Sequence, residues 1–463
     1  MTHVSSLTHA ISINPANGEQ IASYPFESDS ALQALLSRAA AGFHVWRHVP
    51  IAQRSQLLIA LARTLRENAA VTANRITLEM GKPITQARGE MEKCAQLCEW
   101  YAEHGPAMLT AEPTLVEGGK ARIEYRPLGP ILAVMPWNFP IWQVLRGAIP
   151  ALIAGNTYVL KHAPNVMGCA YLLLEAFKQA GFPEGAFEVI NVTPDGVSKA
   201  IADPRIAAVT LTGSVRAGMA IGAQAGAALK KCVLELGGSD PFIVLDDADL
   251  DAAVKAAVIG RYQNTGQVCA AAKRLIVEQG VVEQFTRKFV EATRQLSVGD
   301  PLSPETYIGP MARFDLRDEL DQQVRNTLEE GATLLLGGKM AEGCGNFYEP
   351  TILANVTDQM TSFKQELFGP VASIITARDA THALELANDS EFGLASTIYT
   401  GNVELAQQMA GRLETGGVFI NGYCATDPRV TFGGVKKSGF GRELSHFGVR
   451  EFCNAQTVWL DRH

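Results

Sequence analysis

Cys269 and Glu235 are the two side chains whose setting in the sequence best suits covalent chemistry. Cys269 follows Gly-Gln-Val and precedes Ala270 and Ala271, and these small neighbours leave its sulfur approachable, as a reactive thiol requires. Glu235 stands in the apolar run Val-Leu-Glu-Leu, where burial would raise its pKa toward the range of a general base. Each residue also has a plain structural interpretation: a lone cysteine is commonly a small buried hydrophobe, and Glu235 could form an ion pair at a strand end.

Two further segments offer polar groups to a ligand. Asn138 lies in the proline-punctuated sequence Met-Pro-Trp-Asn-Phe-Pro, where its amide could donate to an oxyanion or simply cap a turn. Residues 211–218, Leu-Thr-Gly-Ser-Val-Arg-Ala-Gly, follow an apolar run, and a helix that begins there would present free N–H groups to a phosphate. The full G-x-G-x-x-G pattern is absent, so a plain turn stays the alternative. No spacing of His, Cys, Asp and Glu indicates a metal site.

Alternating apolar runs and amphipathic segments predict the elements that position these residues. Helices are expected at 167–179 and 197–202, among buried strands at 131–135, 157–160, 187–192, 207–212 and 232–236. This alternation is typical of an α/β fold with a parallel sheet covered on both faces, whose ligands bind beyond the carboxyl ends of the strands. The second half has the same texture, with strands expected at 275–277, 333–336 and 371–376. Residues 109–127 instead predict a β-hairpin that projects from the body.

The composition excludes several classes of protein. Of 463 residues, 47% are hydrophobic and 19% charged, which excludes disorder, and the net charge of −8 comes without the basic stripe of a nucleic-acid-binding protein. Every apolar stretch ends before the ~18 residues that a membrane span needs. No Lys or Arg precedes Arg38, and the eight cysteines are scattered, so neither a secretory leader nor a disulfide framework is indicated. We therefore expect a cytoplasmic protein with neither a nucleic-acid nor a membrane partner.

Five motifs that occur in order resemble the aldehyde dehydrogenase superfamily. They are MPWNFP at 135–140, ELGG at 235–238, GQVC at 266–269, ELFGP at 366–370 and FGGVKKSG at 432–439. The resemblance implies a Rossmann-like NAD(P)-binding domain made of residues 1–108 and 128–236, and an α/β catalytic domain at 237–442. It also implies an oligomerisation element made of the hairpin, 109–127, and the tail, 443–463, which would build a homodimer or homotetramer.

The resemblance implies a role for each matching residue. Cys269 would be the nucleophile, the Asn138 side chain and the Cys269 backbone N–H would hold the oxyanion, and Glu235 would activate water to hydrolyse a thioester. Lys161 would reach the adenosine ribose, and Glu366 the nicotinamide ribose. The expected contacts to the cofactor, NAD or NADP, are Pro136, Trp137, Lys161, Gly213, Ser214, Gly218, Leu236, Glu366 and Phe368.

One position departs from the pattern of NAD-selective members. These carry a Glu three residues after the lysine, and here that position is Pro164. Without the carboxylate, no like charge repels the 2′-phosphate of NADP. We therefore expect both cofactors to be accepted.

Arg146, eight residues after Asn138, bears on the choice of aldehyde. Relatives that act on uncharged aldehydes commonly carry an aromatic residue there, whereas succinate-semialdehyde dehydrogenases carry an Arg. A guanidinium binds a carboxylate bidentately, so Arg146 would anchor the distal carboxylate of the substrate. An Arg packed on a domain surface is the alternative.

The remaining substrate contacts are less uniform. A second Arg of some succinate-semialdehyde dehydrogenases is Gln263 here, but the segment around Thr426, Arg429 and Phe432 is similar to a shorter bacterial branch of these enzymes. Arg429 could complete the carboxylate site, pair with Asp427 or face solvent. The expected activity is NAD(P)-dependent oxidation of succinate semialdehyde to succinate. Oxidation of another small aldehyde, such as glutarate semialdehyde or an aromatic or aliphatic aldehyde, is the alternative.

Overall fold

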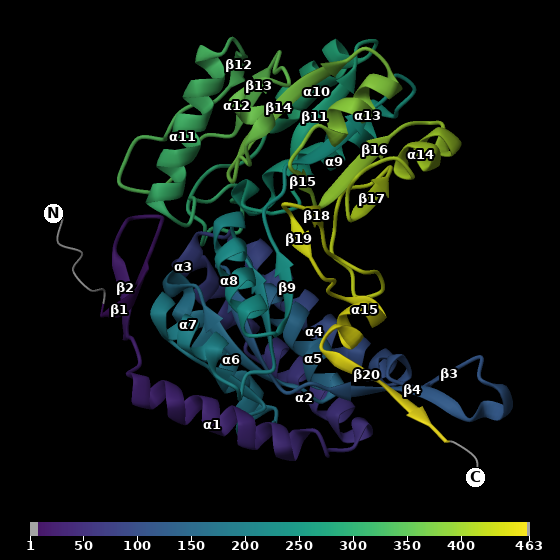
Figure 1. The fold of residues 1–463 in the computed structure, drawn as a ribbon. Coiled ribbons are helices and arrows are strands. Elements are labelled where there is room, and N and C mark those ends of the chain that lie inside the picture. Colours follow the sequence, from purple (N-terminus) through teal and green to yellow (C-terminus); the bar gives the residue numbers. More distant parts are fainter. Residues whose placement is uncertain (1–7, 461–463) are drawn as a thin grey trace.

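The computed structural model describes residues 8–460, and two α/β halves are visible in it, each built around its own sheet (Figure 1). The predicted α/β fold is confirmed. The first sheet has the strand order β19-β9-β8-β5-β6-β7. Its parallel strands are β5 (Pro130–Met135), β6 (Thr157–His162), β7 (Phe187–Val189), β8 (Ala208–Thr212) and β9 (Lys231–Glu235).

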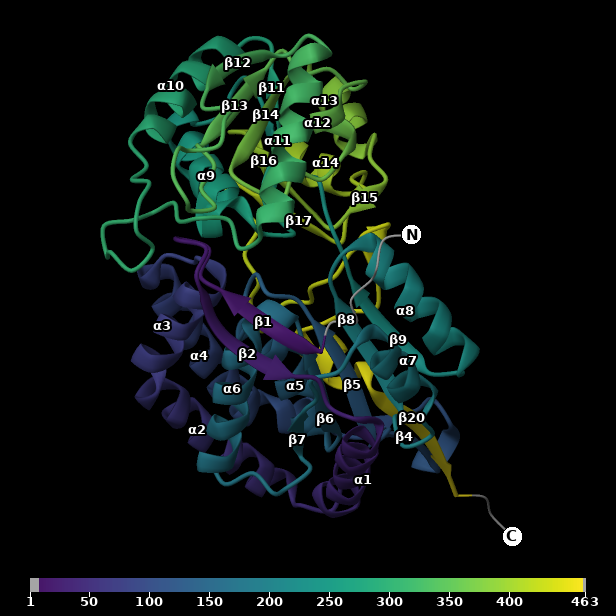
Figure 2. The ribbon, with the colours of Figure 1, turned by 90° about the vertical axis from the view of Figure 1, so that its left-hand side faces the viewer.

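Helices cover both faces of this sheet, which is why its strands are almost wholly apolar. One face packs against α5 (Trp142–Ala154), α6 (Met167–Gln179) and, outside them, α2 (Ile51–Glu67), α3 (Ala69–Met80) and α4 (Ile84–Met108). The other face packs against α1 (Asp29–Trp46), α7 (Pro194–Ala202) and α8 (Val215–Ala227). Figure 2 shows these two groups of helices on opposite sides of the strands, with the hairpin of β1 (His9–Ile13) and β2 (Gln20–Pro25) lying across one edge.

The second sheet has the order β12-β13-β14-β11-β10-β16-β17 and is parallel except for the pair β12–β13. Its strands are β10 (Asp240–Val244), β11 (Ala272–Glu278), β12 (Thr333–Leu336), β13 (Thr351–Ala354), β14 (Val371–Ala377), β16 (Ala395–Tyr399) and β17 (Gly417–Ile420). One face carries α9 (Leu250–Tyr262) and α10 (Val282–Arg294). The other carries α11 (Phe314–Glu329), α12 (Thr361–Lys364), α13 (Ala380–Asn388) and α14 (Val403–Ala410).

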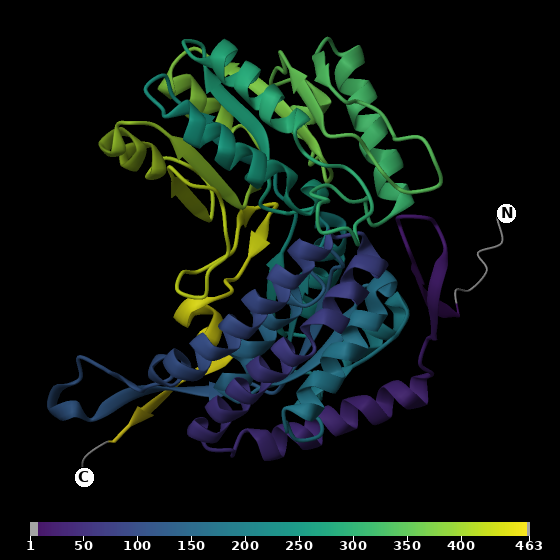
Figure 3. The same ribbon diagram turned by 180° about the vertical axis from the view of Figure 1, so that it is seen from behind.

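The predicted hairpin forms a small third sheet with the end of the chain. β4 (Ala121–Pro127) pairs with β3 (Glu112–Pro113) on one side and with β20 (Cys453–Trp459) on the other, both antiparallel. Figure 3 shows β3, β4 and β20 extending away from the body. The short helix α15 (Ser445–Glu451) precedes β20 and packs on α5.

The five strands predicted for the first sheet and the three predicted for the second are all present. Their ends differ from the prediction by a few residues; β7, for example, stops at Val189. The sequence did not predict β10, β13, β16 or β17, nor β19 (Gly439–Phe440), which joins the first sheet antiparallel to β9. The two-stranded pair of β15 (Phe392–Gly393) and β18 (Val435–Lys436) and the 3-10 turns η1 (Glu117–Gly119), η2 (Pro164–Val166) and η3 (Gln263–Gly266) complete the fold. None of the helices within residues 8–460 is both long and apolar enough to cross a membrane.

Candidate active site

The strand order of the first sheet places several predicted residues together at the carboxyl ends of its strands. Counted along the chain from β5, the order is 3-2-1-4-5, so the sheet changes direction between β5 and β8. Ligands of doubly wound sheets bind beyond the carboxyl ends of the strands at such a point. Asn138 follows β5, Lys161 ends β6, Gly213 follows β8 and Glu235 ends β9. These four residues, far apart in the sequence, therefore share one end of the sheet.

Cys269 follows a turn with an unusual backbone. Asn264, Thr265 and Gly266 all have positive φ, at 53°, 56° and 71°, and a β-branched residue such as Thr265 rarely adopts this conformation. The Thr265 hydroxyl exchanges hydrogen bonds of 3.1 Å with the N–H and carbonyl of Gly309, which hold the turn. At Gly266 a Cβ would lie 2.3 Å from the Gly369 carbonyl oxygen, so only glycine fits. The turn delivers Cys269 to the end of the first sheet.

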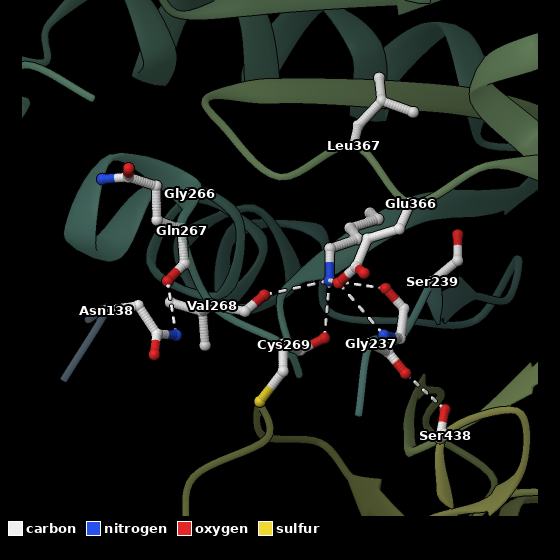
Figure 4. A network of polar contacts seen from close by, with 12 residues as sticks. Asn138, Gly237, Ser239, Gly266, Gln267, Val268, Cys269, Glu366, Leu367 and Ser438 are labelled. Carbon is white, nitrogen blue, oxygen red and sulfur yellow. Dashed lines mark hydrogen bonds and ion pairs between the residues drawn. The ribbon is translucent and has the colours of Figure 1, made fainter. Parts of the chain in front are cut away.

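The Cys269 thiol is half-buried and lies among charged groups. Burial raises its pKa to about 11, while the positive charges of Arg146 and Lys273 act to lower it. Figure 4 shows the sulfur turned away from the polar network that holds the Cys269 backbone. The thiol is therefore partly accessible, and the positive charges of Arg146 and Lys273 favour its ionised form.

The Asn138 amide lies beside the same turn. Its Nδ2 donates to the Gln267 carbonyl at 3.0 Å, and the Asn264 Nδ2 donates to the Asn138 carbonyl at 2.8 Å (Figure 4 shows the first bond). The second hydrogen of Asn138 Nδ2 has no acceptor among the described residues. The amide that the sequence predicted as an oxyanion donor is thus bonded to Gln267, two residues before Cys269 in the chain. Its second N–H is free to donate to an oxyanion.

His162 and Glu90 fix the segment around Asn138 from both sides. Ala163 donates to His162 Nδ1, so the neutral imidazole carries its proton on Nε2, which donates to the Pro140 carbonyl at 2.8 Å. Burial lowers the pKa of His162 to about 4, so the ring is neutral at pH 7. Glu90 accepts from the N–H groups of Ile141 and Trp142, both at 2.9 Å, and thereby caps the start of α5.

Glu235 is 2% exposed, and neither of its carboxylate oxygens has a hydrogen-bond partner within residues 8–460. Burial and the nearby charge of Glu443 raise its pKa to about 8, against the opposing effect of Arg146. At Gly433 a Cβ would lie 2.7 Å from Oε1 of Glu235, so glycine leaves room around the carboxylate. An unbonded buried carboxylate with a pKa near neutrality has the properties of a general base.

Arg146 is 1% exposed and forms a buried ion pair with Glu443. Its guanidinium also stacks 4.8 Å from the ring centre of Phe432 and lies 3.5 Å from the Thr212 hydroxyl. The predicted surface alternative for Arg146 is wrong. Its predicted role in binding a substrate carboxylate stays a prediction, and Glu443 already compensates its charge.

Lys273 joins the Cys269 segment to Glu366. Its Nζ donates to the carbonyls of Gly238 and Cys269, both at 2.6 Å, and to Oε1 of Glu366 at 3.0 Å. Glu366 also accepts from the Gly238 N–H at 3.1 Å, one of the dashed contacts in Figure 4. The network ties β9, the Cys269 segment and the Glu366 loop into one rigid unit.

The other predicted cofactor contacts line the same end of the sheet. Trp137 packs edge-on against Phe368 with ring centres 5.8 Å apart. Ser214 caps α8 through the Ala217 N–H, and Leu236 is held by a bond from its N–H to the Ser438 carbonyl at 3.0 Å. A Cβ at Gly218 would lie 2.5 Å from Leu236, so this glycine allows α8 to pack closely on β9. Pro136 and Gly213 are half-buried at the ends of β5 and β8.

The predicted substrate residues divide into two groups. Phe432 is buried beneath Arg146, and the Thr426 hydroxyl accepts a hydrogen bond from Lys93 at 2.7 Å. Gln263 is exposed at the start of η3. Arg429 pairs with Asp427 at 2.7 Å with 74% of its side chain exposed, so it both pairs with Asp427 and faces solvent, two of its three predicted possibilities. Its part in a carboxylate site stays a prediction.

Sequence reasoning gave no site role to Glu443, Lys273, Glu90, His162 and Lys93. Two of them stood in segments already singled out: His162, next to Lys161, and Glu443, at the start of the C-terminal tail. The other three reach the site only because segments far apart in the chain pack together, which no local pattern encodes.

Comparisons with known proteins agree with this geometry. The sequence model of the aldehyde dehydrogenase family matches residues 3–458. The NAD(P)+ succinate semialdehyde dehydrogenase Sad of Escherichia coli (strain K12) is 65% identical over 99% of both chains. An NADP(+) succinate-semialdehyde dehydrogenase of Mycobacterium avium (strain 104) is 47% identical over 97% of this chain and 96% of the relative. The crystal structure of succinic semialdehyde dehydrogenase from Streptococcus pyogenes with NADP+ superposes with a TM-score of 0.96 at 37% identity, covering 98% of this chain and all of the other.

Proposed function

The chain belongs to the aldehyde dehydrogenase family, and we propose that it oxidises succinate semialdehyde to succinate with NAD or NADP. The observation that carries this proposal is the buried, unbonded carboxylate of Glu235 beside the half-buried thiol of Cys269. A covalent nucleophile beside a base that no donor among residues 8–460 binds suits an acyl-enzyme that water must release.

In the proposed first half-reaction, the Cys269 thiolate attacks the aldehyde carbon and forms a thiohemiacetal. Arg146 and Lys273 favour the thiolate, since both lower the pKa of the thiol. The free N–H of Asn138 and the Cys269 backbone N–H donate to the developing oxyanion, and removing one such donor typically costs ~3 kcal/mol. The carbon then loses a hydride, which leaves a thioester on the sulfur.

In the second half-reaction, Glu235 takes a proton from water, and the resulting hydroxide adds to the thioester carbonyl. The same donors hold the oxyanion, the C–S bond breaks, and the Cys269 thiolate leaves as the carboxylic acid forms. At pH 7 a base with a pKa of about 8 is ionised in roughly one molecule in ten, so its rate contribution rises with pH.

The residues at the carboxyl ends of the first sheet's strands fit a nicotinamide dinucleotide, which when bound accepts the hydride. Lys161 is half-buried and, within the described part of the chain, has no carboxylate partner, while burial lowers its pKa to about 8. Such a cation is stabilised by an anionic or hydroxyl-rich ligand. Pro164, which begins η2, presents no negative charge to a 2′-phosphate. Lys161, Glu366 and the start of α8 would hold the dinucleotide, and both forms would be accepted.

The substrate assignment is supported by the relatives named above and by the positive charge near Cys269. Initial rates of cofactor reduction with succinate semialdehyde and with hexanal, each with NAD and with NADP, test it. We expect kcat/KM to favour the acid-bearing aldehyde by about a hundredfold or more, which corresponds to ~2.7 kcal/mol. Equal values for the two aldehydes would leave a general aldehyde oxidiser, and a strict requirement for NAD would contradict the interpretation of Pro164.

We further propose that the sheet of β3, β4 and β20 is an oligomerisation element of a homodimer or homotetramer. Leu115, Trp459 and Leu460 are exposed on it, and such apolar side chains are commonly covered by a neighbouring subunit. We also propose the division into an NAD(P)-binding domain and a catalytic domain. The two separate sheets support it, although β19, in the segment assigned to the catalytic domain, pairs with β9. A monomeric mass in light scattering would refute the oligomer.

The chain's eight cysteines are all free, which suits the reducing cytoplasm that we propose as its location. Cell fractionation checks this, and recovery of the protein outside the cytoplasmic fraction would contradict it.

A further inference from the structure

Lys273 is a buried cation near the start of β11, directly after the segment that carries the nucleophile. Its side chain is 1% exposed, and its charge is paired with Glu366. The register of β10 on β11 shifts by one residue between Asp240 and Pro241, so Lys273 has no partner in β10. An extra residue of this kind forms a β-bulge, which re-aims a side chain and is common beside active sites.

The Lys273 ammonium lies among carbonyl groups of the nucleophile segment. Its Nζ is 3.0 Å from the Val268 carbonyl oxygen and 2.6 Å from that of Cys269, in addition to its contacts with Gly238 and Glu366. Figure 4 shows the Val268 and Cys269 carbonyl groups turned toward the same nitrogen. An ammonium has three hydrogens, so the four oxygens around this one engage all of them.

The contact with Val268 bears on the oxyanion, because the Val268 carbonyl and the Cys269 N–H belong to one peptide unit. This peptide bond is trans, so the two groups point in opposite directions. The Val268 oxygen accepts from Lys273 and, at 3.2 Å, from the Ala271 N–H. The Cys269 N–H has no acceptor among residues 8–460 and stays available for an oxyanion.

We propose that Lys273 is a positioning residue of the oxyanion site, which acts by holding the peptide unit between Val268 and Cys269. Its bond to the carbonyl oxygen fixes the plane of this peptide, so the N–H keeps its direction while the sulfur forms and breaks bonds. Its positive charge draws electron density toward that oxygen, which makes the N–H at the other end a stronger donor. This inference rests on the proposed covalent chemistry of Cys269.

The test compares two reactions of the Cys269 thiolate in the enzyme without cofactor. The thiolate attacks p-nitrophenyl acetate at its carbonyl carbon: the C–S bond forms through an oxyanion, p-nitrophenolate leaves, and an acetyl thioester remains. It attacks iodoacetamide at the methylene carbon and displaces iodide without forming an oxyanion. The p-nitrophenolate burst gives the rate of acylation, and mass spectrometry of the Cys269 peptide gives the rate of alkylation.

The ratio of acylation to alkylation isolates the oxyanion. Both reactions need the same thiolate in the same folded protein, so changes in the population of either cancel. In Lys273→Met we expect the ratio to fall about ten- to a hundredfold, and Asn138→Ala, which removes an oxyanion donor outright, should lower it at least as far. Lys255→Met, at an exposed lysine on α9, is the matched control and should keep the wild-type ratio.

A second variant keeps the test valid if Lys273→Met does not fold. Lys273→Gln is shorter and neutral but can still donate, so it should lower the ratio by a smaller factor.

The outcomes separate this inference from the proposed function. An unchanged ratio in the Lys273 variants, even with both rates reduced, overturns the oxyanion role and leaves the proposed function standing, because Lys273 then acts only on the thiolate. A burst of p-nitrophenolate that persists in Cys269→Ala overturns both. A reduced ratio in the Lys273 variants, with Lys255→Met unchanged, supports the positioning role.

Discussion

Replacing Glu235 with Gln separates the role of this residue in catalysis from its effect on stability. The native pKa of Glu235 is about 8, against 4.5 for an ordinary glutamate, so the folded protein disfavours an ionisation that the unfolded chain allows. For a group whose native pKa is raised, stability is complete below the unfolded value and is lost as pH rises through the native value. The unbonded carboxylate therefore lowers the free energy of unfolding by about 1 kcal/mol at pH 5 and about 4 kcal/mol at pH 8.

Glu235→Gln removes this loss, so the variant should gain stability over the wild type as pH rises from 5 to 8. In a chain of this length, about 3 kcal/mol more gain at pH 8 than at pH 5 corresponds to roughly 3 °C in Tm. Differential scanning calorimetry at both pH values measures it, and the difference between them cancels the pH-independent contribution of the new amide. Part of the gain comes from relief of the repulsion between Glu235 and Glu443.

The same variant should turn over slowly while still completing one half-reaction. We expect steady-state kcat to fall about 10²- to 10⁴-fold, because the water loses its base, while a stopped-flow burst of cofactor reduction persists. Glu188→Gln is the matched control, since Glu188 is buried but paired with Arg38 at 3.2 Å; it should show no gain that grows with pH. A burst that disappears with turnover, or a Tm gain that is equal at pH 5 and pH 8, would refute the reasoning.

Three more predictions concern neighbouring residues. Cys269→Ala should abolish both the burst and turnover while NADP binding, followed by fluorescence titration, is kept; a residual burst would exclude Cys269 as the nucleophile. Asn138→Ala should lower kcat about 10²- to 10³-fold with a smaller change in KM, because it removes an oxyanion donor, and an unchanged kcat in initial-rate assays would contradict that role. Pro164→Glu should lower kcat/KM for NADP about tenfold or more relative to NAD through like-charge repulsion, and an unchanged cofactor ratio would mean that residue 164 does not face the 2′ position.

The sequence predicted the strands of the first sheet because each is a short apolar run buried on both faces. It missed β10 and β19 for local reasons: β10 begins Asp-Pro after two glycines and a serine, and β19 has only two residues. The sequence could not predict the ion pairs of the site for a different reason. Arg146 and Glu443 meet only after α5 and the segment before α15 have docked, and no periodicity encodes a contact between segments so far apart in the chain.

The candidate site shows the same division. Cys269, Glu235 and Asn138 are marked by their immediate neighbours, so the sequence predicts where they lie. Lys93 and Lys273 are marked by nothing nearby: one stands in an ordinary amphipathic helix and the other in a strand after three alanines. What distinguishes them is the partners that folding supplies.

The pairing of β9 with β19 also bears on how the protein is made. Glu235 lies opposite Gly439, so the strand that carries the base has a free edge until residues near the end of the chain emerge from the ribosome. An open edge of an apolar strand is a template for pairing with other chains. Nascent chains stalled before β19 should therefore aggregate, and full synthesis both closes that edge and brings Glu443 to Arg146. Completion of the active site is thus a late step of biosynthesis, because the pairing with β9 and the contact with Arg146 both need residues 439–443.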